Sequence, residues 1–425
     1  MSEAIGHESF LPHLTELDRR LIAAVRDVRL LAAVSWPTDV QDAFLGRYHR
    51  GDSALPEVVY PVFDYTEVKI ELAAILRATA VFDGHPVADY IHRTAASFHT
   101  TTLLLESLGT DRVTGYSIEL FGRPGHALAG TSQSNLDAAR HFIVLADEVM
   151  PSLAENEASY VLSAETVKQE LDARVVKFFS RHKVRIEIDP TLTAKAAAGP
   201  TRIRLRASTG FTEYDWHQLL EHEAFVHSLT ALNGRDQPNL GSLGLSSARI
   251  TATQEGLATF AELITGSIDI ARMKRISLRI EAIHMALGGA DFIQVFEFFR
   301  GSGQSDADSF TSAMRVYRGV PLTGGHAFTK DTVYLHGLLS VHTFFRWALK
   351  QRKFKLCRNL CAGKMTLGDA VKLEPWFDSG YIAAPAYLPP WMQRANGLAG
   401  VLAFSLFANR IRLDTVVEED LILGV

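Results

Sequence analysis

Cysteine is almost absent from this sequence, which has only Cys357 and Cys361 among 425 residues. Two thiols cannot build a disulfide framework, so a hydrophobic core has to stabilise the fold, and a reducing compartment is expected. The longest apolar run, residues 397–408, is about half of the roughly 20 residues that cross a bilayer. The N-terminus also lacks the basic start and apolar run of a signal peptide. We therefore expect a cytoplasmic protein with no membrane partner.

An excess of charge of one sign is missing as well. The chain has 43 basic and 48 acidic residues, which gives a net charge of -5. This balance gives no reason to expect a nucleic-acid partner. No low-complexity tract occurs, and a hydrophobic content of 47% is that of an ordinary globular protein. The length allows two or three packed units.

Hydrophobic periodicity predicts a mostly helical chain with a short sheet. Apolar residues at three- and four-residue spacing predict helices over residues 14–34, 66–81, 86–108 and 135–149, with a glycine-rich connection over 109–130. Alternating side chains predict strands over 184–188 and 201–206, joined by a loop of small residues, 194–199. Helix resumes near Thr212. We expect an α+β fold with a helical N-terminal region, 1–154, and a second unit, 155–425.

A candidate zinc site begins with His222, Glu223 and His227 in the segment 213–232. A catalytic zinc ion takes three protein ligands and keeps one position for water. A neighbouring carboxylate removes that water's proton, because the metal brings the pKa of the water toward neutrality. A histidine followed directly by glutamate supplies a ligand and a general base from one helix. The pattern therefore predicts His222 and His227 as ligands and Glu223 as the base.

The spacing of the two histidines departs from the familiar zinc-helix motif, in which four residues separate them. A separation of five residues corresponds to about 140° around an α-helix, too far for two imidazoles to share one ion. A π-type turn, with i to i+5 bonding, returns both residues to one face. The spacing therefore predicts a local π distortion between His222 and His227.

The third ligand is predicted to be Glu255, in a helix-like stretch from 253 to 264. Glu262, two turns further along the same face, is the rival. Glycine inside a helix costs about 1 kcal/mol relative to alanine, so Gly256 indicates close packing. We expect Gly256 and Ala258 to let this helix approach the histidine helix, as a zinc–carboxylate bond requires.

With these residues in place, the chain resembles the QEGLA-motif (flavohemoglobin expression-modulating) family, whose superfamily includes the animal microtubule-associated tyrosine carboxypeptidases. The resemblance rests on four motifs in matching order: HExxxH at 222–227, NGRxQP at 233–238, QEGLA at 254–258 and GGxxFTKDxxYLxG at 324–337. It implies a zincin-like metallopeptidase that binds Zn²⁺ through His222, His227 and Glu255, with Glu223 activating water. The animal substrate, the C-terminal tyrosine of α-tubulin, is not carried over, because nothing in the sequence identifies a tubulin-binding surface.

A carboxypeptidase also needs a cation for the terminal carboxylate of its substrate and a donor for the developing oxyanion. The candidate cations are Arg206, Arg315, Arg318 and Lys330. Tyr334 is the first candidate for the donor, ahead of His336 and His342 on the same predicted helix, 330–349. The predicted strand 201–206 precedes the zinc helix, and an edge strand there would pair with extended substrate. A solvated edge protected by arginines is the alternative.

The leading interpretation is a metallocarboxypeptidase acting on a peptide or protein C-terminus, with a preference for aromatic, tyrosine-like residues implied by the resemblance. Two alternatives remain. A zinc endopeptidase would use the same zinc, base and edge strand, and would differ in lacking a cation that closes the cleft. A non-catalytic regulatory protein would keep the fold without turnover. The sequence predicts neither the physiological substrate nor the oligomeric state.

Overall fold

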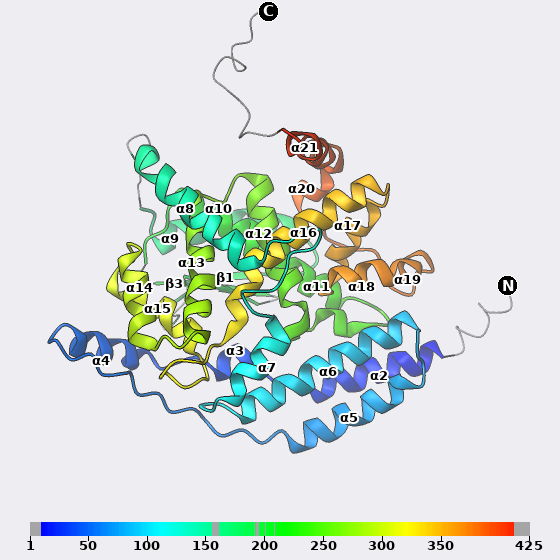
Figure 1. Ribbon diagram of the computed structural model, residues 1–425. Helices are drawn as coiled ribbons and strands as arrows, with labels where there is room; N and C mark the ends of the chain where they lie inside the picture. The colour runs from blue at the N-terminus through cyan, green and yellow to red at the C-terminus, as the bar shows by residue number, and fades with distance from the viewer. Residues whose placement is uncertain are drawn as a thin grey trace, which may run out of the picture.

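The computed structural model describes residues 10–154, 161–190, 192, 195–199, 201–207 and 209–411. Helices dominate this part of the chain, and a small sheet lies among them (Figure 1). The expected α+β, mostly helical class is therefore confirmed. The expected boundary between residues 154 and 155 lies beside residues outside the described ranges, and the two-unit division stays a prediction. No described helix is both long and apolar enough to cross a membrane.

Of the helices before the sheet, α2, α5 and α6 lie below it in Figure 1, whereas α8 lies above it. Their bounds are α2 (Leu11–Ala24), α3 (Leu30–Ala33), α4 (Thr38–Tyr48), α5 (Thr66–Ala80), α6 (Pro86–Glu106), α7 (Arg112–Phe121), α8 (Asn135–Ala154) and α9 (Ala164–Phe178). Two expectations were wrong: the single helix over 14–34 is broken between α2 and α3, and α7 occupies the expected glycine-rich connection.

The sheet has the strand order β1-β3-β2, with β1 (Arg185–Asp189) parallel to β3 (Arg202–Arg206) and β2 (Ala196–Ala198) antiparallel to β3. Ile186, Ile203 and Leu205 are buried against α9 and the helices that follow the sheet. The segment predicted as an edge strand, 201–206, is therefore the central strand. The edge strands are β1 and β2, and β2 falls in the segment predicted as a loop.

Helices after the sheet carry most of the motif residues. Their bounds are α10 (Glu213–Leu219), a π-helix (Leu220–Ser228), α11 (Leu229–Arg235), α12 (Thr251–Thr265), α13 (Ile270–Leu287), α14 (Phe292–Gly301), α15 (Asp306–Tyr317), α16 (Val333–Lys350), α17 (Lys355–Asn359), α18 (Leu367–Lys372), α19 (Glu374–Asp378), α20 (Pro390–Gln393) and α21 (Ala395–Ala408). Thr212 caps α10 with a reciprocal capping box to Asp215, which explains why helix resumes there.

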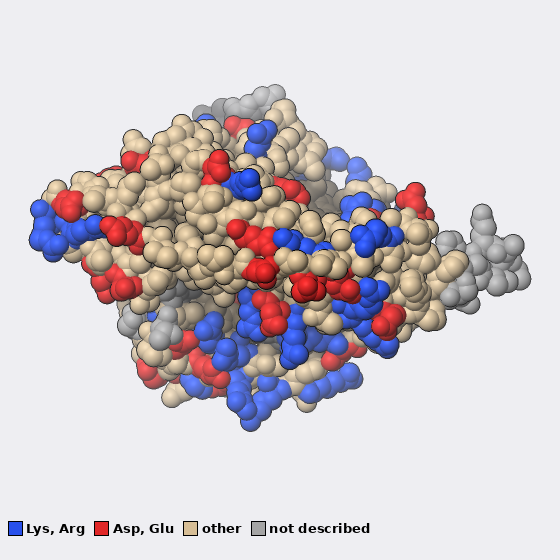
Figure 2. All heavy atoms as spheres, turned by 90° about the horizontal axis from the view of Figure 1, so that it is seen from below, with Lys and Arg blue, Asp and Glu red and all other residues tan. Residues whose placement is uncertain are grey.

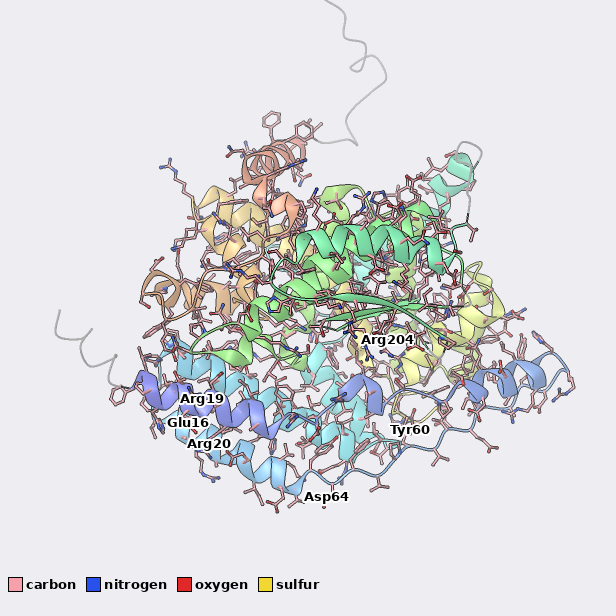
Figure 3. All side chains as sticks on the ribbon, turned by 180° about the vertical axis from the view of Figure 1, so that it is seen from behind. Glu16, Arg19, Arg20, Tyr60, Asp64 and Arg204 are labelled. Atoms are coloured by element: carbon pink, nitrogen blue, oxygen red, sulfur yellow. The ribbon has the colours of Figure 1, made fainter. Side chains whose placement is uncertain are left out.

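A long segment between α4 and α5 runs along the outside of the molecule, and Tyr60 and Asp64 lie on it (Figure 3). The Tyr60 hydroxyl accepts hydrogen bonds from the indole N–H of Trp36, at 2.6 Å, and from the backbone N–H of Gly319, at 2.8 Å. These bonds tie the segment to the residues after α3 and to the end of α15. Figure 3 also places Arg204 on β3.

Charge is distributed unevenly over the face seen from below. Lysine and arginine side chains gather in one part of this face, next to a band of acidic side chains, and a wide area carries few charges (Figure 2). Side chains of both charge signs are present on this face, as expected from the near balance of 43 basic and 48 acidic residues in the sequence.

The crossing of α12 and α16 is unusually close. A Cβ atom built at Gly256 would lie 2.3 Å from the carbonyl oxygen of Gly337, and one at Gly337 would lie 2.1 Å from the carbonyl oxygen of Ala252. Gly256 therefore permits contact with α16, not the contact with the histidine helix that we expected. The crossing brings the start of α16 against α12, which carries Glu255.

Replacing Gly256 with alanine is expected to lower the free energy of unfolding by about 1–3 kcal/mol, because the added methyl group forces backbone apart. Gly115→Ala in α7 is the matched control, since a Cβ there meets nothing within 4 Å. The control should be neutral or stabilising by up to about 1 kcal/mol. Urea unfolding midpoints measure both changes. Equal stability of Gly256→Ala and the natural chain would contradict the close crossing.

Candidate active site

His222 and His227 lie on the π-helix Leu220–Ser228. The wider turn brings residues five apart onto one face, and the centroids of the two imidazole rings are 4.7 Å apart. The predicted π distortion is thus confirmed. It extends through nine residues, more than the single turn that the spacing required.

Glu255 on α12 faces both histidines. Its Oε2 atom lies 3.4 Å from Nε2 of His222 and 3.5 Å from Nε2 of His227. One donor atom from each of the three residues lies within 4.8 Å of the others. Tetrahedral bonds of about 2.0–2.2 Å place neighbouring ligand atoms about 3.3–3.6 Å apart. The chemistry of the three donors and the two separations from Glu255 to the histidines therefore fit one zinc ion.

Glu262, the rival ligand, lies on the other side of the His222 ring. Its Oε1 atom is 2.6 Å from Nδ1 of His222, and Arg272 contacts the same oxygen at 3.2 Å. Burial alone would raise the pKa of Glu262, but the charge of Arg272 and the bond to His222 lower it to about 2. A carboxylate on Nδ1 leaves Nε2 directed at Glu255 and fixes the ring. Glu262 therefore orients His222 and is outside the three-residue group.

Lys330 holds the second oxygen of Glu255. Its Nζ atom donates to Glu255 Oε1 at 3.0 Å and to the hydroxyl of Tyr334 at 3.2 Å. Burial by itself would raise the pKa of Glu255, but the charge of Lys330 and the hydrogen bonds from the two histidines keep it well below its usual value. Glu255 is therefore an anion. Lys330 binds its Oε1 atom, and its Oε2 atom faces the two histidines.

A cavity of about 510 Å³ opens beside the three residues and is lined by His222, Glu223 and Tyr334. We call it the basic cavity, because five arginines also line it: Arg206, Arg272, Arg275, Arg279 and Arg315. Lys195 adds a sixth cation, and the acidic residues in the lining are Asp215, Glu223 and Asp308. Positive charge therefore exceeds negative charge in its walls.

Arg279 and Arg315, which line this cavity, share the buried carboxylate of Asp331. Arg315 makes two bonds to Asp331, at 2.6 and 2.7 Å, and Arg279 lies 3.7 Å from the same group. Burial, followed by the charge of Arg315, lowers the pKa of Arg279 to about 9. A buried cation that shares one carboxylate with a second cation is incompletely neutralised. Binding of an additional anion beside it is therefore favourable.

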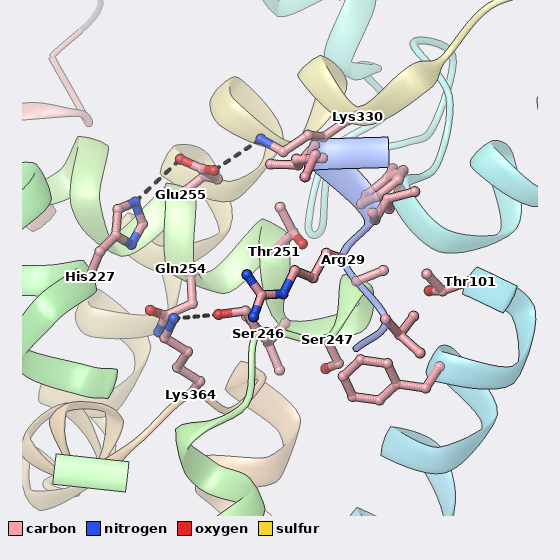
Figure 4. Close-up of a pocket in the computed structure, with 18 of the residues that line it drawn as sticks. Arg29, Thr101, His227, Ser246, Ser247, Thr251, Gln254, Glu255, Lys330 and Lys364 are labelled. Atoms are coloured by element: carbon pink, nitrogen blue, oxygen red, sulfur yellow. Dashed lines mark hydrogen bonds and ion pairs between the residues drawn. The ribbon is translucent and has the colours of Figure 1, made fainter. Parts of the chain in front are cut away.

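A second cavity, of about 420 Å³, lies on the side of His227, Glu255 and Lys330 (Figure 4). Edge strand β2 extends from the basic cavity to the second cavity. Lys195 and Ala196 line the basic cavity, whereas Ala198 and Gly199 line the second cavity. The hydroxyl of Ser228 donates to the carbonyl of Gly199 at 2.9 Å and fastens this strand to the π-helix. The candidate metal ligands thus lie between two cavities, and both cavities are lined in part by the β2 segment.

The family model described as microtubule-associated tyrosine carboxypeptidase matches residues 47–410, well over half of the chain. The chain belongs to this family. The relation suspected from the four motifs is therefore confirmed, and membership implies a peptidase of the carboxypeptidase type. A comparison with curated proteins finds no match.

In this member of the tyrosine carboxypeptidase family, most of the candidate residues from the sequence line one of the two cavities beside the candidate metal ligands. Glu223, Arg206, Arg315 and Tyr334 line the basic cavity, and Lys330 lines the second cavity. Three other candidates lie elsewhere: Arg318, His336 and His342 are in the lining of neither cavity. His342 instead packs near the ring of Phe260.

Sequence reasoning missed three arginines on α13. Arg272, Arg275 and Arg279 recur at three- and four-residue spacing, which places them on one face of the helix. That stripe is visible in the sequence, but arginines at this spacing are typical of a solvated helix face. Their approach to the site depends on how α13 packs, and only the three-dimensional structure gives that.

Proposed function

We propose that the chain is a zinc-dependent carboxypeptidase with a zincin-like core. His222, His227 and Glu255 are the proposed zinc ligands, and Glu223 is the proposed general base. One observation carries the proposal. One donor atom from each of His222, His227 and Glu255 lies within 4.8 Å of the others, and His222 lines a cavity whose lining combines Glu223 with five arginines.

The side chains around the triad have separate tasks in this proposal. A zinc ion bound there would supply Lewis acidity and a water molecule with a pKa near neutrality. Glu223 lines the same cavity as His222 without belonging to the three-residue group, so its carboxylate accepts the proton of the attacking water. Tyr334 accepts a hydrogen bond from Lys330, which leaves its own proton for the developing oxyanion.

The substrate carboxylate binds the basic cavity in this proposal. Arg315 and Arg279 both face the carboxylate of Asp331, and a terminal carboxylate would give these two cations a second anionic partner. Arg206 lies on the same wall, at the end of β3. Lys330 is a weaker candidate, because Glu255 already occupies its ammonium group.

Strand addition gives the substrate its direction. With the carboxylate in the basic cavity, the residues before the scissile bond extend toward Ala198, Gly199 and the second cavity. The substrate then runs antiparallel to β2 and pairs with that edge. The family's name adds a preference for a C-terminal tyrosine, which we propose for this chain without tubulin as the substrate.

The arginines favour the carboxypeptidase over a zinc endopeptidase, which would leave the cavity open for further residues. The test uses one peptide as a free acid and as its C-terminal amide, with and without a chelator. We expect the amide to be cleaved at least about 100-fold more slowly, since removing one partner of a buried arginine–carboxylate pair costs about 3–5 kcal/mol. The chelator should stop both reactions.

Mass spectrometry of the products identifies the bond that is cut. Equal cleavage of acid and amide would make the endopeptidase the better assignment. Bound zinc without turnover of any peptide would favour a non-catalytic protein.

A further inference from the structure

The wall of the second cavity farthest from the metal ligands comes from the N-terminal segment. Five consecutive residues, 28–32, line the cavity together with Phe98 and Phe121. Figure 4 shows Arg29 reaching across the cavity, and side chains built only of carbon on the side away from His227 and Glu255. Val28 and Arg29 lie in the break between α2 and α3, and residues 30–32 belong to α3, so the break and the helix after it shape the cavity.

The two ends of this cavity differ in chemistry. His227, Glu255, Gln254 and the two lysines, Lys330 and Lys364, form the polar end. Both lysines have partners, because Lys330 contacts Glu255 at 3.0 Å and Lys364 contacts the Ser246 hydroxyl at 2.6 Å. The apolar lining consists of Val28, Leu30, Leu31, Phe98, Phe121 and Ile250, with three alanines. A polar backbone fits the first end and an apolar side chain fits the second.

The segment is held in place from both sides. Val25 and Val34 are 3% and 0% exposed, and Trp36 is 4% exposed and bonded to Tyr60. Leu31 between these anchors is 45% exposed. An exposed leucine beside a cavity, on a fixed stretch of backbone, has apolar surface left to bury against a ligand.

Residues 28–32 precede the family match, which begins at residue 47. The match therefore covers the proposed metal ligands and the basic cavity, but not this wall of the second cavity. Any selectivity that the wall provides is a property of this chain's own N-terminal segment.

We propose that the second cavity is a subsite for a large apolar side chain, such as leucine or phenylalanine, on a residue that precedes the scissile bond. Leu30, Leu31 and Phe98 form its walls. This inference rests on the proposed function, because the position of the terminal carboxylate in the basic cavity decides which substrate residues reach the second cavity.

The experiment uses two peptide series cleaved by the full-length zinc-loaded protein. The first keeps the last residue constant and places Leu, Phe, Ala or Asp at each of the two positions before the scissile bond. The second varies only the last residue. In the first series, kcat/KM for Leu or Phe should exceed that for Ala by about 10- to 100-fold at one position, the range that apolar pockets provide.

Leu31→Ser is the test variant, because its exposure makes the fold tolerant of the change. We expect the Leu-to-Ala preference in the first series to fall about tenfold, with the second series unchanged. Val62→Ser is the matched control, since Val62 is 98% exposed and lines neither cavity. The control should keep the preference of the natural chain.

Two outcomes of the cleavage experiments would contradict the subsite. A preference for Asp over Leu would assign the cavity to an acidic side chain recognised by Arg29. A Leu31→Ser effect confined to the second series would place the substrate's last residue in this cavity. If no peptide is cleaved, binding of the same peptides is measured by fluorescence anisotropy. Leu-selective binding lost in Leu31→Ser then supports the subsite while the proposed function fails, and unselective binding overturns both.

Discussion

Replacing Glu223 with glutamine should lower kcat by about 10²- to 10⁴-fold, the contribution of a positioned general base. The amide keeps the shape of the side chain but cannot accept the proton of water. Zinc content should stay near one ion per chain, because Glu223 is not among the three residues that face each other. Steady-state kinetics on the free-acid peptide and elemental analysis of the same sample measure the two quantities.

The neighbouring Glu221→Gln is the matched control for this prediction. Glu221 lies on the same π-helix but lines neither cavity. Burial raises its pKa to about 7, so the neutral form, which an amide resembles, is well populated near neutral pH. The control should keep most of the activity. If Glu223→Gln does so as well, another residue is the base.

Loss of a proposed ligand should lower zinc affinity as well as turnover, unlike the change at Glu223. His227→Ala and Glu255→Ala are expected to lower zinc affinity by more than about 100-fold and to remove turnover with it, since changes behind a ligand already cost 10- to 100-fold. Glu262→Gln changes a group behind His222, so its loss of affinity should fall within that smaller range. Competition with a chromogenic chelator measures all three.

One further control makes this series decisive. Circular dichroism should show that the variants keep their helical content, because the triad sits on helices packed by extensive cores. Full zinc affinity in a folded Glu255→Ala variant would remove this residue from the ligand set. Equal losses in Glu262→Gln and Glu255→Ala would return Glu262 to the position of rival ligand.

The sequence predicted those parts of the site that depend on local spacing. On a regular α-helix, the five-residue spacing of His222 and His227 would prevent the two imidazoles from sharing a metal. Once both were assigned to one metal site, helix geometry predicted the π-helix. Glu255 was reached through its motif and the need for a third ligand. Class and main helices followed from periodicity, because that signal is strong over 15 or more residues.

Tertiary packing determines what the sequence could not predict. β2 consists of three alanines, too short and too weakly patterned to be told from a loop, and only its pairing with β3 makes it a strand. The apolar period of 14–34 continues through the break after Ala24, so nothing local marked the exposure of residues 28–32 to the cavity. The partner of Gly256 was misassigned because the crossing helix lies about 80 residues further on.

The π-helix has a consequence at the level of the gene. A helix absorbs one additional residue as a π-turn, and the segments before and after it keep their phase. In this chain α10 and α11 flank the turn directly, without a loop on either side. A motif with four-residue spacing and the five-residue spacing of His222 and His227 therefore differ by one codon. A single in-frame insertion or deletion interconverts the two spacings.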